Sequence, residues 1–471
     1  MKNPLHIITR IIYHLFILFV LLLCTNSVFL LSSGAFDSVV MLVCIFMSFF
    51  FWIWPDVYGK DIREGRVRQL WFGNIQLTLF LEALVISIIY TYLELFRFHM
   101  VNDTGTSLSQ LVIDGNEVLF TASWKRIVAH IIVASVFLSI TFWIGIIRIY
   151  LTSIQLGIKH RIIGILFGLV FPVNIVVLII MLRITQKEVM FENDKALLNE
   201  KRRQEQICAT KYPVLLLHGV FFRDFKYLDY WGRIPKELMT NGCRIFYGEQ
   251  QSAAPVEVTG REVARKIEEI VKVTGSPKVN IIAHSKGGLD ARCAMSDPEI
   301  AKHVASLTTI NTPHRGCDFA DYLLDKIPEK IQKTVAGGYN TALHRMGDYN
   351  PDFIGACRDL TASACRDFNE RIKDPQGVYI QSYGSILKKA RGGRFPLNMT
   401  YRYVGIFDGK NDGLVATDSF PWGHEFHMLE APGMRGISHG DMIDLNRENI
   451  PGFDVREFYV GLVADLKKKG F

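Results

Sequence analysis

The feature that most constrains this chain is a series of long apolar runs in its first 185 residues. A helix needs about 20 mainly apolar residues to cross a hydrocarbon core about 30 Å thick. Five stretches reach that length, and they cover about 9–31, 36–55, 72–96, 127–150 and 162–184. The sequence therefore predicts an all-α transmembrane domain of about five helices over residues 1–185.

The first run is longer than the roughly 7–15 apolar residues of a secretory signal, and the second run follows almost at once. We therefore expect a retained helix that forms a tight hairpin with the second. The loop at about 98–126 contains "LVIDGNEVLF", two short apolar segments around a turn, which predicts a small β-hairpin.

Lys and Arg near the ends of the predicted helices indicate the orientation. Nine lie on the N-terminal side and six on the opposite side, which favours a cytoplasmic N-terminus. Five crossings then put the rest of the chain on the non-cytoplasmic side. Counting Lys201, Arg202 and Arg203 equalises the two sides, and an even number of helices reverses the answer.

Glu82 and His130 are ionisable residues inside the predicted spans. A charge at that depth is costly and often functional, so transport is one hypothesis. The alternative is a protonated or helix-paired glutamate that only fixes packing, and the lack of an evident inverted repeat favours it. Residues 186–212 are charged with balanced signs, and they predict a juxtamembrane helix and spacer that Pro213 ends.

From residue 213 to 471, short apolar strands alternate with amphipathic helices. Strands are expected in "VLLLHG", "RIFYG", "KVNIIAH", "SLTTIN", "GVYIQSYG" and "YRYVGIF", and helices at 227–241, 259–273, from about 286, and at 453–468. This alternation predicts an α/β fold whose mostly parallel sheet is covered on both faces. In such sheets the functional site lies at the carboxyl ends of the strands.

Charge and cysteine content exclude some functions. The net charge of +7 is spread out, without a basic stripe interleaved with aromatics, so nucleic acid is not expected as a partner. None of the eight cysteines forms a CxxC pair, which gives no support to a zinc or thioredoxin-like site. The six in the soluble part are compatible with disulfides or with free thiols.

Ser285 follows the apolar strand "KVNIIAH" and precedes a helix. "AHSKG" has the small-x-Ser-x-Gly spacing of a nucleophile elbow, in which Ala283 and Gly287 must be small because strand and helix nearly touch. An ordinary turn serine is the alternative for so short a pattern. Lys286 and Val220 are positioned to donate the two backbone amides of an oxyanion hole, with Gly219 allowing the turn.

A serine nucleophile needs a histidine base and an acid that orients it, in the order Ser, acid, His. "YRYVGIFDGKNDGLV" offers Asp408 and Asp412. His439 lies in "GISHGDM" just before the closing helix, where the base is expected. His424 and His427 flank a probable strand, so we expect them to be surface or packing residues.

Together, "VLLLHGV", "AHSKGG", "NTPHRGCDFADYL", "NDGLV" and "SHGD" make residues 212–471 resemble bacterial true triacylglycerol lipases of the foldase-assisted type. The resemblance implies an α/β-hydrolase fold, with Ser285, Asp412 and His439 as nucleophile, acid and base. It also implies an oxyanion hole from Val220 and Lys286, a foldase-type chaperone as partner and no required cofactor. The family's structural calcium would use Asp441, but no second acid precedes "YRYVGIF".

"NTPHRG" resembles the segment that leads into the family's lid. After Gly316, apolar residues recur every four positions, at Phe319, Leu323, Ile327, Ile331 and Val335, and Pro328 divides the stretch into two short helices. Such a stripe is commonly core. Its place after a site-forming strand favours a movable cover.

The sequence thus predicts a membrane-anchored serine hydrolase that cleaves lipid esters, such as acylglycerols or phospholipids, through an acyl-enzyme. Two alternatives remain. A lipid acyltransferase would use the same triad with an alcohol acceptor, and a membrane transport or sensing protein would carry an inactive hydrolase domain.

Overall fold

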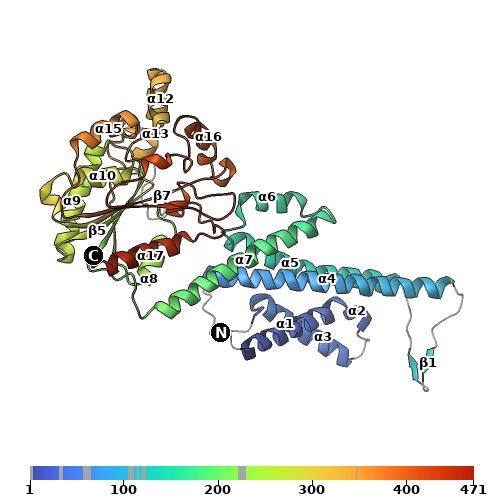
Figure 1. Cartoon of the computed structure of the whole chain (residues 1–471). Helices are drawn as coiled ribbons and strands as arrows, with labels where there is room; N and C mark the ends of the chain where they lie inside the picture. The colour runs from blue at the N-terminus through green and yellow to red at the C-terminus, as the bar shows by residue number, and fades with distance from the viewer. Residues whose placement is uncertain are drawn as a thin grey trace. The chain divides into compact units, whose positions relative to one another are not determined.

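The chain forms two compact units, Met1–Leu198 and Asn199–Phe471, in the computed structural model (Figure 1). The structure describes residues 4–30, 35–56, 65–103, 111–113, 116–118, 124–220, 230–345 and 347–471.

The first unit is almost entirely helical. Its helices are α1 (Pro4–Thr25), α2 (Ser27–Leu30), α3 (Ala35–Ile53), α4 (Gly65–Asp103), α5 (Trp124–Thr152), α6 (Gly157–Phe167) and α7 (Val173–Arg202), the last of which runs on into the second unit. The predicted hairpin is confirmed, because β1 (Leu111–Ile113) pairs antiparallel with β2 (Asn116–Val118).

Three of the described helices are long and apolar enough to cross a membrane, at Ile7–Thr25, Gly65–Phe96 and Trp124–Thr152, and Asp37–Ile53 is a shorter apolar helix. The prediction of a fifth continuous span at 162–184 is wrong. Helix α6 ends at Phe167, and Gly168 and Pro172 lie in the break before α7. Proline lacks the amide that a continuous helix would need there. The count of five crossings, on which the predicted orientation depended, is therefore not supported.

Glu82 and His130 both have partners. Glu82 Oε2 lies 2.8 Å from His14 Nε2, which joins α4 to α1. His130 Nε2 lies 3.0 Å from the Thr91 hydroxyl, which joins α5 to α4. These contacts agree with the packing alternative for Glu82.

A six-stranded parallel sheet forms the centre of the second unit, in the order β4-β3-β5-β6-β7-β8. The strands are β3 (Val214–Leu217), β4 (Ile245–Tyr247), β5 (Val279–His284), β6 (Val304–Ile310), β7 (Tyr379–Ser385) and β8 (Glu425–Leu429). Every residue of β3, β5 and β6 is buried, as continuous apolar runs in a two-sided sheet predict.

Helices cover both faces of this sheet (Figure 1). The helices of this unit are α8 (Ile234–Thr240), α9 (Val256–Thr274), α10 (Lys286–Ala294), α11 (Pro298–Ala301), α12 (Asp318–Lys326), α13 (Glu329–Arg345), α14 (Phe353–Arg358), α15 (Ala362–Arg371), α16 (Leu397–Phe407) and α17 (Val455–Lys468). Alternate residues of β3 separate the two cores. Val214 and Leu216 pack with α8 and α17, whereas Leu215 and Leu217 pack with α9 and α10. The predicted α/β architecture is confirmed.

One predicted strand is wrong. "YRYVGIF" belongs to α16, whose buried residues Leu397 and Val404 are seven positions apart, with Thr400 and Tyr401 partly buried between them. That spacing is helical, although Tyr, Val, Ile and Phe favour strands. The sixth strand is β8 instead, which His424 precedes and which contains His427.

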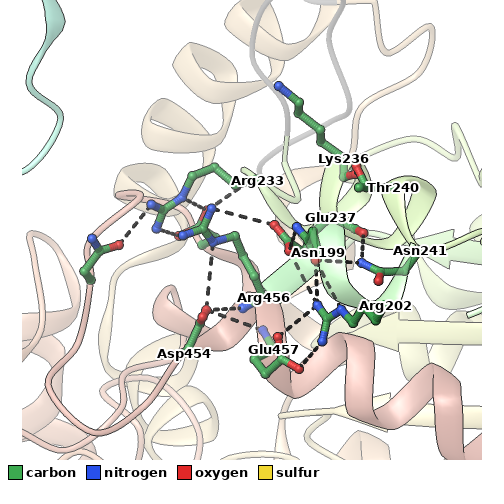
Figure 2. A network of polar contacts seen from close by, with 12 residues as sticks. Asn199, Arg202, Arg233, Lys236, Glu237, Thr240, Asn241, Asp454, Arg456 and Glu457 are labelled. Carbon is green, nitrogen blue, oxygen red and sulfur yellow. Dashed lines mark hydrogen bonds and ion pairs between the residues drawn. The ribbon is translucent and has the colours of Figure 1, made fainter. Parts of the chain in front are cut away.

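The end of α7 is held in the second unit by a polar network (Figure 2). The Arg202 guanidinium donates to both carboxylate oxygens of Glu457 in α17, at 2.5 and 3.1 Å. Asn199 donates to Glu237 in α8, and Arg202 lies 3.7 Å from the same carboxylate. Part of the segment expected to be a solvated spacer is therefore a packed element of the second unit.

Candidate active site

Ser285 occupies the sharp turn between β5 and α10 with φ +54° and ψ −131°. Such a conformation is costly for a residue with a Cβ and persists only where its surroundings enforce it. The Ser285 amide donates to the Ile310 carbonyl at 2.9 Å, and its carbonyl accepts from the Thr312 hydroxyl at 2.8 Å. The backbone of β6 and the turn after it thus holds the serine in this geometry.

Three glycines allow the chain segments to approach Ser285. A Cβ on Gly287 would lie 2.5 Å from the His218 carbonyl oxygen, and one on Gly288 would lie 2.2 Å from the Thr312 hydroxyl. A Cβ on Gly219 would lie 2.8 Å from the Ser285 Cβ. The loop after β3 therefore lies directly against the serine, where an oxyanion hole requires it.

Asp412 and His439 form a buried pair. His439 Nδ1 lies 2.6 Å from Asp412 Oδ2, and the His439 amide donates to the Asp412 carbonyl at 2.9 Å. Asn311 donates to the same Oδ2 at 2.5 Å, while the amides of Leu414 and Val415 donate to Oδ1 at 2.9 and 2.8 Å. Donors on both oxygens fix the carboxylate, so it can orient the imidazole as a catalytic acid does.

The other candidate acid lies elsewhere. Asp408 accepts hydrogen bonds from the amides of Asp318 and Phe319, at 2.8 and 3.0 Å, and so caps the N-terminus of α12. His424 contacts the backbone of Ile380, and His427 is half-exposed beside Glu425. The structure brings only Asp412 and His439 together from the two candidate sets.

A second histidine, His284, lies against the base, with ring centroids 4.5 Å apart. Its Nε2 lies 3.2 Å from the His439 carbonyl oxygen, which can only accept, so Nε2 donates and Nδ1 must accept. The Tyr230 hydroxyl donates to that Nδ1 at 2.7 Å and accepts from the Gly219 amide at 2.8 Å. One continuous hydrogen-bond chain therefore joins the loop of the base to the loop of the oxyanion hole.

Complete burial and the adjacent His439 lower the pKa of His284 well below the ordinary 6.5, in agreement with a neutral ring. The sequence reasoning did not identify His284, Tyr230 or Asn311 as site residues. Only the position of His284 directly before the serine was a local signal, because Tyr230 and Asn311 reach the site through the fold.

Lys286 directly follows Ser285 in the chain. Lys286 is buried, and its Nζ donates to Asp290 at 2.7 Å and to Thr259 at 2.8 Å. Its side chain is thus directed to Thr259 in α9 and Asp290 in α10. Val220 lines the same cavity as Ser285.

The cavity beside Ser285 has a volume of about 410 Å³ and an almost entirely apolar lining. It is lined by all five residues of the predicted stripe, Phe319, Leu323, Ile327, Ile331 and Val335, and also by Tyr339, Phe353 and Leu414. Helices α12 and α13 meet at Ile327 and Pro328, as predicted. A partly open apolar cavity of this size suits a fatty acyl chain.

Asp441 does not suit the calcium site that the resemblance implies. Arg435 donates to both of its carboxylate oxygens, at 2.7 and 3.1 Å, and the Ser438 amide donates to Oδ2 at 2.8 Å. A guanidinium already neutralises this carboxylate. Among the residues that the structure describes, no group of three or more His, Cys, Asp or Glu side chains is arranged to hold a metal ion.

The eight cysteines are all free, so none forms a disulfide.

The strand order and the serine elbow at the carboxyl end of β5 define an α/β-hydrolase.

Comparison with known proteins narrows this class. No protein-family model matches the chain. A triacylglycerol lipase of Vibrio cholerae serotype O1 is 29% identical over 266 residues, which are 50% of this chain and 84% of the relative. A triacylglycerol lipase of Pseudarthrobacter phenanthrenivorans is 33% identical over 176 residues, which are 34% of this chain and 54% of the relative.

Among solved structures, the mature lipase of Bacillus licheniformis aligns with 54% of this chain and 92% of its own, at 19% identity and a TM-score of 0.41. At that score the fold assignment depends on the strand order described above. The strand order and the two sequence relatives together indicate that the second unit is a lipase-like carboxylic ester hydrolase of the α/β-hydrolase superfamily.

Proposed function

We propose that the chain is a membrane-anchored serine hydrolase that cleaves carboxylic esters of lipids through an acyl-enzyme on Ser285. The observation that carries the proposal is the hydrogen-bonded Asp412–His439 pair beside the strained serine turn. His439 takes the proton from the Ser285 hydroxyl as the oxygen attacks the ester carbonyl. The amides of Val220 and Lys286 stabilise the oxyanion, and water then hydrolyses the acyl-enzyme.

The apolar cavity supports a lipid ester as substrate. Its lining offers almost no polar partner, so the part of the substrate that it accepts is hydrocarbon. The three helices long enough to span a bilayer support membrane attachment. In this account the first unit anchors the enzyme, and the Glu82–His14 pair stabilises helix packing.

Substitution of the nucleophile tests the proposal. Ser285→Ala in the full chain should lower hydrolysis of a short water-soluble ester and of a diacylglycerol by about 10⁴-fold, because no other group forms the acyl-enzyme. Ser296→Ala, just beyond the end of α10, is the matched control and should keep full activity. Undiminished hydrolysis by Ser285→Ala would exclude this mechanism. Product analysis with an added alcohol separates hydrolysis from acyl transfer.

A further inference from the structure

Helix α16 presents an apolar face to solvent. Its residues Met399, Tyr403 and Ile406 are 55%, 53% and 73% exposed, and they share one side because they are four and three positions apart. Phe395, two residues before the helix, is 78% exposed. A helix that only packs on its own domain carries polar residues on the outer side. A cluster of exposed apolar side chains marks an interaction surface instead.

Cations flank this face along the sequence. Residues 388–407 contain five Lys or Arg and no Asp or Glu, and the next acid, Asp408, is already engaged in capping α12. Lys388 and Arg394 pair with Glu430 and Glu448. Within the described part of the chain, no carboxylate forms an ion pair with Lys389, Arg391, Arg402 or Lys410, so these four charges face solvent or lie at its edge.

The adjoining side of the same helix reaches the catalytic cavity. Thr400 lines the cavity with Ser285. The rings of Tyr403 and Phe407 lie 6.1 and 5.8 Å from the ring of Phe319 in α12, and Tyr322 lies 4.5 Å from Phe407. The exposed apolar surface is therefore continuous with the helices that cover the cavity.

We propose that Phe395, Met399, Arg402, Tyr403 and Ile406, with the flanking cations Lys389, Arg391 and Lys410, form a docking surface for a bilayer rich in anionic phospholipid. The inference rests on the proposed function, which it extends by naming the surface that presents the substrate. Apolar side chains that enter the acyl boundary, next to cations that contact phosphate groups, are the chemistry of an interfacial helix. The absence of acids within residues 388–407 and the cations left without a carboxylate partner favour a lipid surface over a protein partner.

The test uses the full chain in nanodiscs of phosphatidylcholine, with or without phosphatidylglycerol. Hydrogen–deuterium exchange of residues 395–407 should slow when phosphatidylglycerol is present, and Ser285→Ala should behave in the same way. The triple variant R391Q/R402Q/K410Q should lose that protection. Hydrolysis of a lipid ester in the same bilayer should fall about tenfold in this variant, because three charges no longer contact phosphate groups. Its rate on a short water-soluble ester should not change.

The matched control is K236Q/K272Q/K468Q, which removes three exposed cations from α8, α9 and α17 and should keep both the protection and the activity. A second variant, M399S/I406S, should lose the protection while the short ester is still cleaved. Equal exchange in neutral and anionic nanodiscs would overturn the proposal. Protection that appears only with an added protein, whatever the lipid charge, would overturn it in favour of a protein partner. Because exchange does not require catalysis, loss of the proposed activity would be distinguished from loss of docking.

Discussion

Asp408 and Asp412 lie four residues apart in one acidic turn, but they stabilise different parts of the site. Asp412 orients the histidine, whereas Asp408 caps a helix that lines the cavity. Asp412 is buried and accepts from Asn311, His439 and two backbone amides, so it belongs to a closed polar network. Asp408 caps α12, whose other contacts around the cavity are largely apolar. Directional hydrogen bonds fix the catalytic side, whereas apolar contacts dominate the covering side.

Substitution of these two carboxylates should change kcat by very different amounts. Asp412→Asn should lower kcat by about 10³–10⁴-fold, because the amide no longer holds His439 in the correct tautomer. Asp408→Asn should change kcat on a short ester by less than about threefold, since it weakens only a helix cap. Steady-state kinetics of both variants checks this. The reverse ranking would mean that Asp408 is the catalytic acid.

Tyr230→Phe tests whether the polar side acts as one unit. The change leaves the Gly219 amide and His284 Nδ1 without their shared partner, which should lower kcat about tenfold with little change in KM. Tyr459→Phe is the matched control, because Tyr459 is also buried but its hydroxyl bonds to the Met442 carbonyl. Equal kcat values in the two variants would show that the chain through His284 does not position the site.

Metal removal should leave the polar side intact. Since Arg435 already neutralises Asp441, EDTA should change neither activity nor Tm by a measurable amount. Arg435→Gln should lower the free energy of unfolding by about 3 kcal/mol, because it leaves a largely buried carboxylate without its cation. Thermal unfolding of both proteins, with and without EDTA, measures this. A fall in activity on chelation that calcium reverses would restore the calcium hypothesis.

The smallest effect is a pH dependence of stability. Burial and the adjacent His439 hold the pKa of His284 well below 6.5, so between those values the unfolded chain binds a proton that the folded chain excludes. His284 therefore lowers stability as the pH falls below about 6.5, by up to about 1.4 kcal/mol per pH unit. His284→Asn should reduce the slope of Tm against pH, because it removes the contribution of the one proton that His284 binds on unfolding. An unchanged slope would show that His284 is protonated in the folded protein.

Much of the second unit could be predicted because local patterns and the fold agree there. Apolar runs such as "KVNIIAH" are too short for helices and end in turn residues, so β5 and the position of Ser285 followed directly. The apolar stripe through α12 and α13 could also be predicted, because its members recur every four residues. Each of them lines the cavity.

The incorrect predictions share a physical cause. Tertiary packing decided between two secondary structures that the same residues could adopt. "YRYVGIF" has strand-forming side chains, yet burial every three or four residues makes it helical. At 162–184, hydropathy alone joined two helices across Gly168 and Pro172. The contacts of Asn311 with Asp412 and of Tyr230 with His284 join residues 101 and 54 positions apart, which no local pattern records.

Covalent labelling of the full chain with a fluorophosphonate, followed by peptide mass spectrometry, tests directly whether Ser285 is the nucleophile. We expect one adduct on Ser285, abolished in Ser285→Ala and slowed about 10³-fold or more in Asp412→Asn. Comparison of intact with permeabilised cells would also report the side of the membrane on which the serine lies. Failure of the natural chain to react, or an adduct on another residue that persists in Ser285→Ala, would contradict the assignment.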